Sequence, residues 1–305
     1  MMQPKKLLLQ TTIPTTGDDW SIARFSKLGA LFREQWDEDG NPLYEVTMRD
    51  REPLGAPDSV LSTIDESDFD QLWLFAVDTG DGLTSEDCEA ISRFRRNGGG
   101  LFVTRDHMDL GSSVCNLGGV GKAHYFHSTH LDPDPERHKR DDPYTTNISW
   151  PNFHSGANGD YQEIEIVGAS HPVLTNAQSP TGLLRFLPSH PHEGGIGAPD
   201  GEDARVISRG RSMVTGLDFN IAVAFEPGTH GGPAIAESTF HHFADYNWDP
   251  TSGAPSFVTE QPGDGLRRHP EALADTHRYA LNIAAWLSGN VPAGAKATMA
   301  EGQLA

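Results

Sequence analysis

The chain has 305 residues, of which 36% are hydrophobic and 22% are charged, and its formal net charge is −20. A chain of this length and composition can bury a core of its own, which excludes collagen, a coiled coil and wholesale disorder. The acidic excess repels phosphate backbones and anionic lipid headgroups. We therefore expect a small molecule as the partner, rather than nucleic acid or a membrane, and we leave open whether copies of the chain form a homo-oligomer.

Cysteine content and apolar runs bear on the compartment. Cys88 and Cys115 are too few for a disulfide framework or a four-thiolate metal site. The apolar run near the N-terminus is too short for the core of a signal peptide, and no run of 18 apolar residues exists. These features predict a cytoplasmic protein.

The first hundred residues alternate between short apolar runs and amphipathic stretches. Continuous apolar runs are typical of strands that are covered on both faces, and apolar spacing of three to four residues is typical of a helix. Strands that alternate with helices in this way predict a parallel sheet with helices on its faces. The predicted strands are Lys5–Gln10, Leu43–Met48, Gln71–Val77 and Leu101–Thr104, and the predicted helices are Trp20–Trp36 and the segment from the capping residue Thr84 to Gly98.

The periodicity is lost between residues 118 and 161, where His, Asp, Pro, Asn and Gly dominate. Aromatic residues in this segment favour an ordered insertion, which we expect to act as an active-site lid. Overall, we expect a flavodoxin-like three-layer α/β sandwich with a mostly parallel sheet, a single domain over residues 1–289, and a flexible tail over residues 290–305. Strands are predicted again at Leu183–Leu187, Arg205–Ser208, Ile221–Phe225 and Ala234–Thr239, and Pro270 begins the last predicted helix.

Histidine residues follow three of the predicted strands. His107 follows the strand that ends at Thr104, His190 and His192 follow the strand that ends at Leu187, and His241 and His242 follow Thr239. Because the carboxyl ends of parallel strands meet at one edge of a sheet, we expect His107, His192 and His241 to share one pocket.

Imidazole together with carboxylate suits a borderline transition metal, which makes Zn, Fe or Mn the expected cofactor. We predict His107, His192, Glu193 and His241 as its ligands, and no nucleotide cofactor is evident. Two alternatives remain. His190 and His192 are also compatible with a surface turn stiffened by Pro191. His241 and His242 point to opposite faces if they lie in a strand, in which case one of them packs in the core.

Acid and base chemistry also has candidates. Asp106 can orient the His107 imidazole, so both are predicted as catalytic residues together with His242. An alternative for Asp106 is the N-cap of a following helix. The histidines at 124, 127 and 130 form a triple whose role as metal ligands stays open.

Four polar residues outside the predicted helices and strands are candidates for substrate binding. We assign this role to Arg105, which follows a strand, and to His154, Asn158 and Asp160, which lie in a loop rich in Gly and Asn. The alternative for the loop residues is a turn that Asn and Asp side chains hold in place.

Three short motifs resemble the trehalose-utilisation (ThuA-like) branch of the class I glutamine amidotransferase-like superfamily. They are GGGLFVTRDH at 98–107, HPVL at 171–174 and STFHHF at 238–243. The resemblance implies a flavodoxin-like amidotransferase fold and a small polyhydroxylated or carbonyl-bearing substrate. Where amidotransferases have a nucleophilic cysteine in a Gly-x-Cys-x-Gly elbow, this chain has His107, so the resemblance does not extend to glutaminase activity.

The leading hypothesis is therefore a metal-assisted or His/Asp-dependent enzyme: a hydrolase, a lyase or an oxidoreductase. A second hypothesis is a non-catalytic ligand-binding or partner subunit that keeps the fold without the cysteine. A third is an amidase that uses Cys115.

Overall fold

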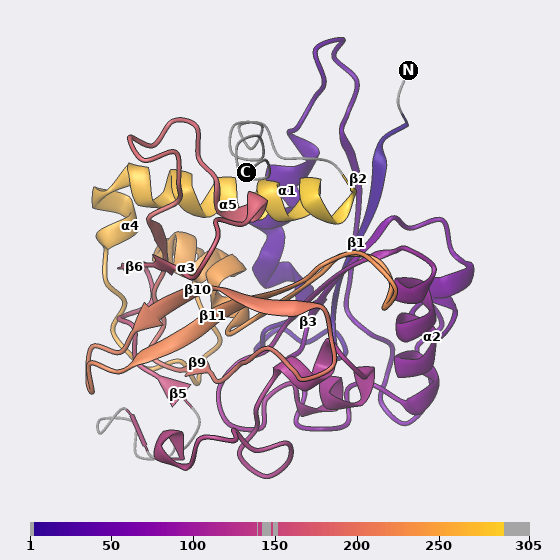
Figure 1. The fold of residues 1–305 in the computed structure, drawn as a ribbon, viewed down its shortest axis with the longest axis horizontal. Coiled ribbons are helices and arrows are strands. Elements are labelled where there is room, and N and C mark those ends of the chain that lie inside the picture. The colour runs from indigo at the N-terminus through magenta and orange to yellow at the C-terminus, as the bar shows by residue number, and fades with distance from the viewer. Residues whose placement is uncertain (1–2, 139, 142–147, 149–151, 290–305) are drawn as a thin grey trace, which may run out of the picture.

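The computed structural model describes residues 3–138, 140, 141, 148 and 152–289. These residues form one large sheet, two small sheets and helices that cover the large sheet (Figure 1). The strands are β1 (Lys5–Thr11), β2 (Tyr44–Arg49), β3 (Gln71–Phe75), β4 (Gly100–Thr104), β5 (Asn152–Phe153), β6 (Tyr161–Glu163), β7 (Glu165–Ile166), β8 (Phe186–Pro188), β9 (Glu193–Gly194), β10 (Ala204–Arg211), β11 (Asp218–Phe225) and β12 (Ala234–Glu237). The α-helices are α1 (Ser26–Arg33), α2 (Ser85–Arg96), α3 (Asp245–Trp248), α4 (Gly265–Arg268) and α5 (Pro270–Leu287).

The large sheet has the strand order β2-β1-β3-β4-β12-β11-β10-β7. The first five strands pair in parallel, and the last three continue the sheet in antiparallel fashion. The parallel part has the order 2-1-3-4-5 of flavodoxin-like sheets, with β12 in the fifth position. The fold is thus α/β with a mostly parallel sheet, and β11, β10 and β7 form an antiparallel extension beside β12.

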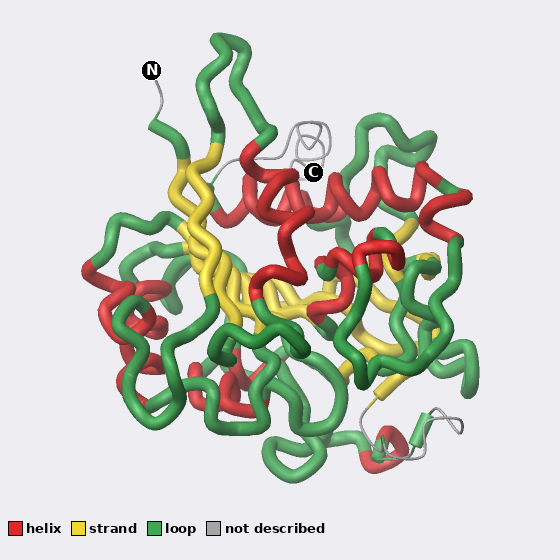
Figure 2. Tube along the Cα trace, turned by 180° about the vertical axis from the view of Figure 1, so that it is seen from behind, coloured by secondary structure: helices red, strands yellow, loops and turns green. Residues whose placement is uncertain are grey.

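Two apolar clusters lie on the two faces of this sheet, which gives three layers. On one face, the side chains of β1, β3 and β4 at alternate positions pack against α1 and α5. On the other face, the intervening positions pack against α2 and the 3-10 helix Leu61–Glu66. Figure 2 shows the sheet between these helices from behind. This burial on both faces explains why β3 and β4 are continuously apolar.

Most predicted elements exist close to their predicted bounds, but two expectations are wrong. The segment Leu183–Leu187 forms no strand of the large sheet. Phe186–Pro188 pairs with β6, and Leu183 forms an isolated bridge with Thr175. The predicted helix Trp20–Trp36 is shorter, because its first turn is the 3-10 helix Ile22–Phe25 and α1 ends at Arg33. The side chain of Trp36 is 59% exposed, outside the apolar face.

The insertion 118–161 contains little regular structure in its described residues. It includes the 3-10 helices Gly121–Ala123 and Pro135–Arg137 and ends in β5 and the start of β6. Residues 139, 142–147 and 149–151 of the predicted lid, and the predicted tail 290–305, lie outside the described residues.

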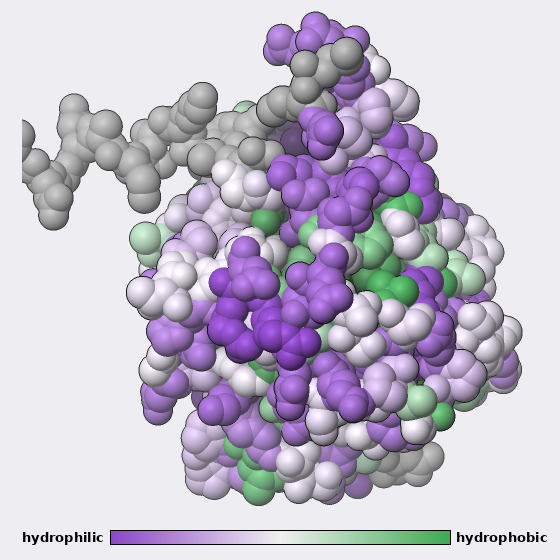
Figure 3. All heavy atoms as spheres, turned by 90° about the vertical axis from the view of Figure 1, so that its right-hand side faces the viewer, coloured by the Kyte–Doolittle hydropathy of each residue, from purple (hydrophilic) through white to green (hydrophobic). Residues whose placement is uncertain are grey.

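The surface seen from the right-hand side of Figure 1 is mainly hydrophilic, with small hydrophobic patches between the polar side chains (Figure 3). None of the helices among the described residues is long and apolar enough to cross a bilayer.

Candidate functional site

A cavity of about 320 Å³ lies where four neighbouring strands of the sheet end. Trp20 comes from the segment after β1, Val77 follows β3, His107 follows β4 and His241 follows β12, and all four residues line it. His192 lines it as well, from the loop after β8. His107, His192 and His241 therefore line one cavity. The parallel strands β4 and β12 bring His107 and His241 there, whereas His192 reaches it from a loop that follows a small separate sheet.

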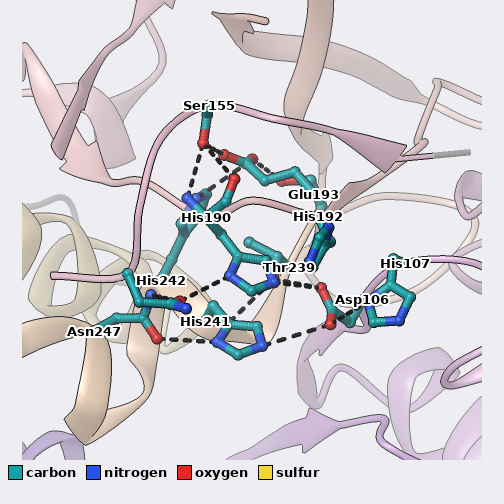
Figure 4. Close-up of polar contacts among 12 residues, drawn as sticks. Asp106, His107, Ser155, His190, His192, Glu193, Thr239, His241, His242 and Asn247 are labelled. Atoms are coloured by element: carbon teal, nitrogen blue, oxygen red, sulfur yellow. Dashed lines mark hydrogen bonds and ion pairs between the residues drawn. The ribbon is translucent and has the colours of Figure 1, made fainter. Parts of the chain in front are cut away.

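Asp106 is the centre of the polar contacts in this cavity (Figure 4). Thr239 Oγ1 donates to its Oδ1 at 3.0 Å, and His107 Nδ1 lies 2.9 Å from its Oδ2. Two further imidazoles face the same carboxylate: His190 Nε2 is 3.4 Å from Oδ1, and His241 Nε2 is 3.5 Å from Oδ2. The Asp106 side chain is only 2% exposed, so these contacts replace its hydration.

Two asparagines fix the protons on both imidazoles. Asn247 Nδ2 donates to the carbonyl oxygen of Ser189 at 3.2 Å, which orients the Asn247 amide because a carbonyl can only accept. Its Oδ1 then accepts from His241 Nδ1 at 3.0 Å, and its Nδ2 also donates to Asn158 Oδ1 at 2.8 Å. Asn158 Oδ1 in turn accepts from His190 Nδ1 at 2.9 Å. Both histidines therefore carry their proton on Nδ1.

A neutral imidazole with its proton on Nδ1 presents a lone pair at Nε2. Burial, together with the nearby His241, holds the pKa of His190 well below its usual value, so His190 is neutral. Its Nε2 has no hydrogen-bond partner, although it points at the carboxylate of Asp106. A lone pair facing a carboxylate is repulsive unless a cation lies between them.

The spacing of these atoms fits a metal ion. One ligand atom from each of Asp106, His190 and His241 lies within 4.8 Å of the other two. Among the described residues, these three form the group of His, Cys, Asp or Glu side chains that is close enough together to hold a metal ion. Bonds of about 2.1 Å in tetrahedral geometry separate ligand atoms by about 3.4 Å. The carboxylate–imidazole separations of 3.4 and 3.5 Å match this value. The hydrogen bonds from Nδ1 to the asparagines are the outer contacts that metal-bound histidines generally make.

Two more histidines lie beside this group. The rings of His107 and His192 are 5.2 Å apart, and the His107 side chain is 18% exposed. His192 Nε2 lies 3.3 Å from Glu260 Oε1, and this contact is the main reason why the pKa of Glu260 is lowered to about 2. Both imidazoles line the cavity, within reach of a molecule bound there.

A second buried polar cluster lies behind the cavity and contains His242, Glu193 and Glu237. His242 Nδ1 lies 2.8 Å from Glu237 Oε1, and its Nε2 lies 3.5 Å from Glu193 Oε2. Glu193 also accepts from Ser155 and Gln162. Burial opposes a charge on His242, but Glu237 and Glu193 raise its pKa to about 10. In this cluster, the positive charge of His242 is balanced by the neighbouring carboxylates of Glu193 and Glu237.

Only some of the predicted catalytic, metal-binding and substrate-binding residues line this cavity. Asp106, His107, Asn158, His192 and His241 line the cavity, whereas Glu193 and His242 do not. Glu193 points away from His192 because neighbouring residues of an extended segment face opposite sides. The 3-10 helix Phe240–Phe243 likewise turns His241 and His242 toward different partners.

Three predicted substrate-binding residues lie outside this cavity. Arg105 is fully buried beside the ring of Phe126. His154 and Asp160 line a separate cavity of about 450 Å³, and Asp160 Oδ1 accepts from the backbone N–H of Gly265 where α4 begins. Asp106, for its part, caps no α-helix, because the chain after His107 turns through Met108, whose φ is 49°.

The histidine triple at 124, 127 and 130 does not converge on one point. His124 is buried, whereas the side chains of His127 and His130 are exposed. The thiols also lie away from the cavity lining. Burial raises the pKa of Cys88 to about 12 and also raises the pKa of Cys115, so neither is poised as a thiolate.

The sequence predicts His192 and Glu193, and not His190, for the group that the structure places around Asp106. The motif His-Pro-His contained both imidazoles, but only the asparagine contacts distinguish them, and Asn158 and Asn247 are 89 residues apart in the chain.

No family model matches the sequence, and no curated protein matches it. Solved structures give distant likenesses. The glutaminase domain of Trypanosoma brucei CTPS with bound acivicin is 13% identical, with a TM-score of 0.49, and the match covers 94% of each chain. The carbohydrate deacetylase Agd3 is 10% identical, with a TM-score of 0.38, over 77% of this chain and 29% of the deacetylase chain.

A third likeness is the exo-β-1,4-mannosidase Op5Man5 from Opitutaceae bacterium strain TAV5, which is 9% identical, with a TM-score of 0.33, over 92% of this chain and 36% of the mannosidase. This chain thus spans about a third of the deacetylase and of the mannosidase. Likenesses this remote carry no functional inference, and the fold assignment rests on the strand order of the sheet.

Proposed function

We propose that Asp106, His190 and His241 bind a divalent transition metal such as Zn, Fe or Mn, and that the protein is a metal-dependent hydrolase of a small carbonyl-bearing substrate. The observation that carries the proposal is the pair of imidazoles whose Nδ1 protons are committed to Asn158 and Asn247, and whose Nε2 atoms face one carboxylate. A bound ion of this kind polarises a carbonyl group and lowers the pKa of water.

The remaining residues of the cavity have roles that follow from their positions. His107 and His192 stand next to the proposed ligands, where they hold or move a proton on the substrate. His107 is oriented by Asp106, and His192 by Glu260. These contacts fix the two rings in place before the substrate arrives.

The lining of the cavity indicates the class of substrate. The described lining residues include the carboxylates of Asp19 and Glu260 and the apolar side chains of Trp20, Phe257 and Val258, and none of them is Lys or Arg. A cavity of about 320 Å³ suits a small molecule. We therefore propose a neutral or cationic substrate, including polyhydroxylated compounds, because no Lys or Arg side chain is present to pair with an anionic group away from the proposed metal ion.

The motifs at 98–107, 171–174 and 238–243 support a place for this chain in the ThuA-like branch of the class I glutamine amidotransferase-like superfamily. The first of them forms β4 and the segment with Asp106 and His107, and the third follows β12 and includes His241. We further propose that the enzyme is cytoplasmic. We propose that the enzyme catalyses a reaction other than glutamine hydrolysis, because His107 stands where amidotransferases have the nucleophilic cysteine.

Metal analysis tests the proposal directly. Protein purified without a His tag and equilibrated with Zn²⁺, Mn²⁺ or Fe²⁺ should retain about one ion per chain after dialysis, and the variants Asp106→Asn, His190→Gln and His241→Gln should retain far less. His230→Gln is the matched control, because His230 lies outside this cavity and its side chain is 44% exposed. Equal retention in all variants, or no stoichiometric metal in the wild type, would contradict the proposal.

Activity is the second test. Neutral acyl esters and amides, offered with and without the metal, should be hydrolysed by the loaded wild type and by His230→Gln, but not by His190→Gln. His107→Ala should keep the metal and lose most of the turnover, by about 10²–10⁴-fold, since its contribution is proton transfer. Full activity after removal of the metal would instead favour a His/Asp-dependent mechanism without an ion.

A further inference from the structure

Arg105 is a buried cation without a hydrogen-bonding partner. Its side chain is 0% exposed, and its Nε, Nη1 and Nη2 atoms form no hydrogen bond. The guanidinium lies 4.4 Å above the ring of Phe126, but it makes no ion pair with any carboxylate among the described residues. A buried charge of this kind is costly unless an opposite charge and hydrogen bonds compensate it.

Two further buried side chains without partners lie around this guanidinium. A Cβ atom at Gly194 would be 2.6 Å from Arg105 Nη1, so the guanidinium lies directly against this glycine. Asn152 pairs with Gly194 across β5 and β9, and His124 pairs with Ile196 in an isolated bridge. Side chains of paired residues lie on the same face of a ladder, and so do those of residues two apart. Asn152 and His124 therefore face the side where Arg105 lies.

The side-chain polar atoms of Arg105, Asn152 and His124 have no hydrogen-bond partners. Asn152 Nδ2 and Oδ1 and both ring nitrogens of His124 form no hydrogen bond, and these residues are 1% and 0% exposed. Burial, together with the charge of Arg105, holds the pKa of His124 well below its usual value, so His124 is a neutral donor of one N–H. This contribution of Arg105 also indicates that the two groups are close together.

The charge of this cluster is positive. Arg105 carries a positive charge, because a guanidinium group is not deprotonated in proteins. The carboxylate of Asp106 is committed to Thr239 and the histidines. Donors from the guanidinium, the amide and the imidazole outnumber the acceptors of the cluster.

We propose that Arg105, His124 and Asn152 form a buried binding site for a small inorganic anion such as chloride. The anion supplies the negative charge and the acceptor that the three side chains lack. The site is distinct from the proposed metal site, because neither His124, Asn152 nor Arg105 lines the cavity around Asp106. Gly194 makes room for the guanidinium, which any side chain at this position would displace.

Thermal unfolding in chloride tests this site. A ligand that binds only the folded state raises its stability as the ligand concentration rises. At constant ionic strength, replacing gluconate by chloride should raise the Tm of the wild type by several degrees, and the rise should be absent in Arg105→Met. Arg95→Met is the control that should keep the rise, because the Arg95 guanidinium already has the carbonyl of Gly232 and Glu202 as partners.

Asn152→Asp provides the second variant, in case Arg105→Met does not fold. This change adds a carboxylate beside the guanidinium with almost no change in volume, so it should raise the Tm in gluconate and abolish the chloride effect. Bromide in crystals should give an anomalous peak next to Arg105 in the wild type and none in Asn152→Asp. A wild type that is indifferent to chloride would mean that water fills the cluster and would overturn the proposal, as would an equal chloride effect in Asn152→Asp.

Discussion

Asp58 is a buried carboxylate whose contacts all favour its ionised form. Arg49 Nη1 lies 2.6 Å from its Oδ1, and the backbone N–H groups of Glu52, Val60 and Leu61 donate to its two oxygens. Burial acts in the opposite direction, but these donors lower the pKa of Asp58 to about 2. Its folded-state pKa thus lies below the unfolded value of 3.8, so it stabilises the fold above about pH 4 and loses this effect as the pH falls through 2.

Asp58→Asn should therefore lower the free energy of unfolding at pH 7 by about 2 kcal/mol, which corresponds to the difference between the two pKa values. The gap between variant and wild type should close as the pH falls from 4 to 2, because the wild type loses the same contribution. Urea unfolding at a series of pH values measures both effects. Glu38→Gln, at an exposed side chain, should leave the curve almost unchanged. Parallel curves for Asp58→Asn and wild type would contradict this assignment.

The cysteines should be dispensable for metal binding and turnover. Cys88 packs in α2 at 3% exposure as a small apolar residue, and Cys115 is half-buried. The double variant Cys88→Ala, Cys115→Ser should lose about 1 kcal/mol of stability and keep its metal content and activity. Loss of activity in Cys115→Ser together with full activity in His107→Ala would restore the thiol amidase hypothesis.

Asn158 could be predicted from its loop rich in Gly and Asn, and the other predicted residues of the cavity from the apolar runs that precede them. Asp106, His107 and His241 were found this way, because β4 and β12 are recognisable as apolar runs. His190 was not selected, since it follows a short strand of a small sheet and is held by asparagines from distant segments. Arg105 follows the same strand as Asp106, but alternation turns it to the other side, into the interior.

The first turn of α2 is the element whose sequence signal the structure reproduces most directly. Thr84 Oγ1 accepts from the backbone N–H of Asp87, and the Asp87 carboxylate accepts from the backbone N–H of Thr84. Thr84→Ala should cost about 1 kcal/mol of stability, while Thr84→Ser should cost much less because it keeps the acceptor. Chemical denaturation of the three proteins measures this difference. Equal losses in both variants would show that the methyl group of Thr84, rather than its hydroxyl, stabilises the helix.

Elements that are buried on both faces or amphipathic were predictable, and elements that depend on pairing were not. The strands β1, β3 and β4 and the helices α2 and α5 follow from their apolar periodicity. By contrast, the run 183–187 packs against α5, and it pairs only locally, through the bridge of Leu183 with Thr175 and through β8 with β6. An apolar run predicts that a segment is buried, but it does not predict which strand the segment pairs with.

At the scale of the whole molecule, the fold brings together three chain segments that are far apart in the sequence. Asp106 follows β4, His190 lies between β8 and β9, and His241 follows β12. The strand order that places β12 beside β4 joins two of these segments, and no local pattern in the sequence specifies it. A metal ion bound to all three would exist only in the folded state, so it should link the stability of the sheet edge to metal concentration.

Removal of the metal should therefore lower the Tm of the wild type. At a free metal concentration 100-fold above Kd, binding contributes about 2.7 kcal/mol. For a chain of this size, whose unfolding entropy is about 0.6 kcal/mol/K, this corresponds to a fall of about 4 °C when a chelator is added. Differential scanning calorimetry with and without EDTA measures the shift, and added Zn²⁺ or Mn²⁺ should reverse it.

Asp106→Asn is the informative comparison, because it keeps the shape of the site and removes the charge that a cation requires. Its Tm should be insensitive to EDTA and to added metal, whereas His230→Gln should respond like the wild type. The metal-free variant should be at least as stable as the metal-free wild type, since an amide in place of the carboxylate relieves the repulsion by the Nε2 lone pairs of His190 and His241. An equal chelator shift in Asp106→Asn and wild type would place the metal elsewhere in the molecule.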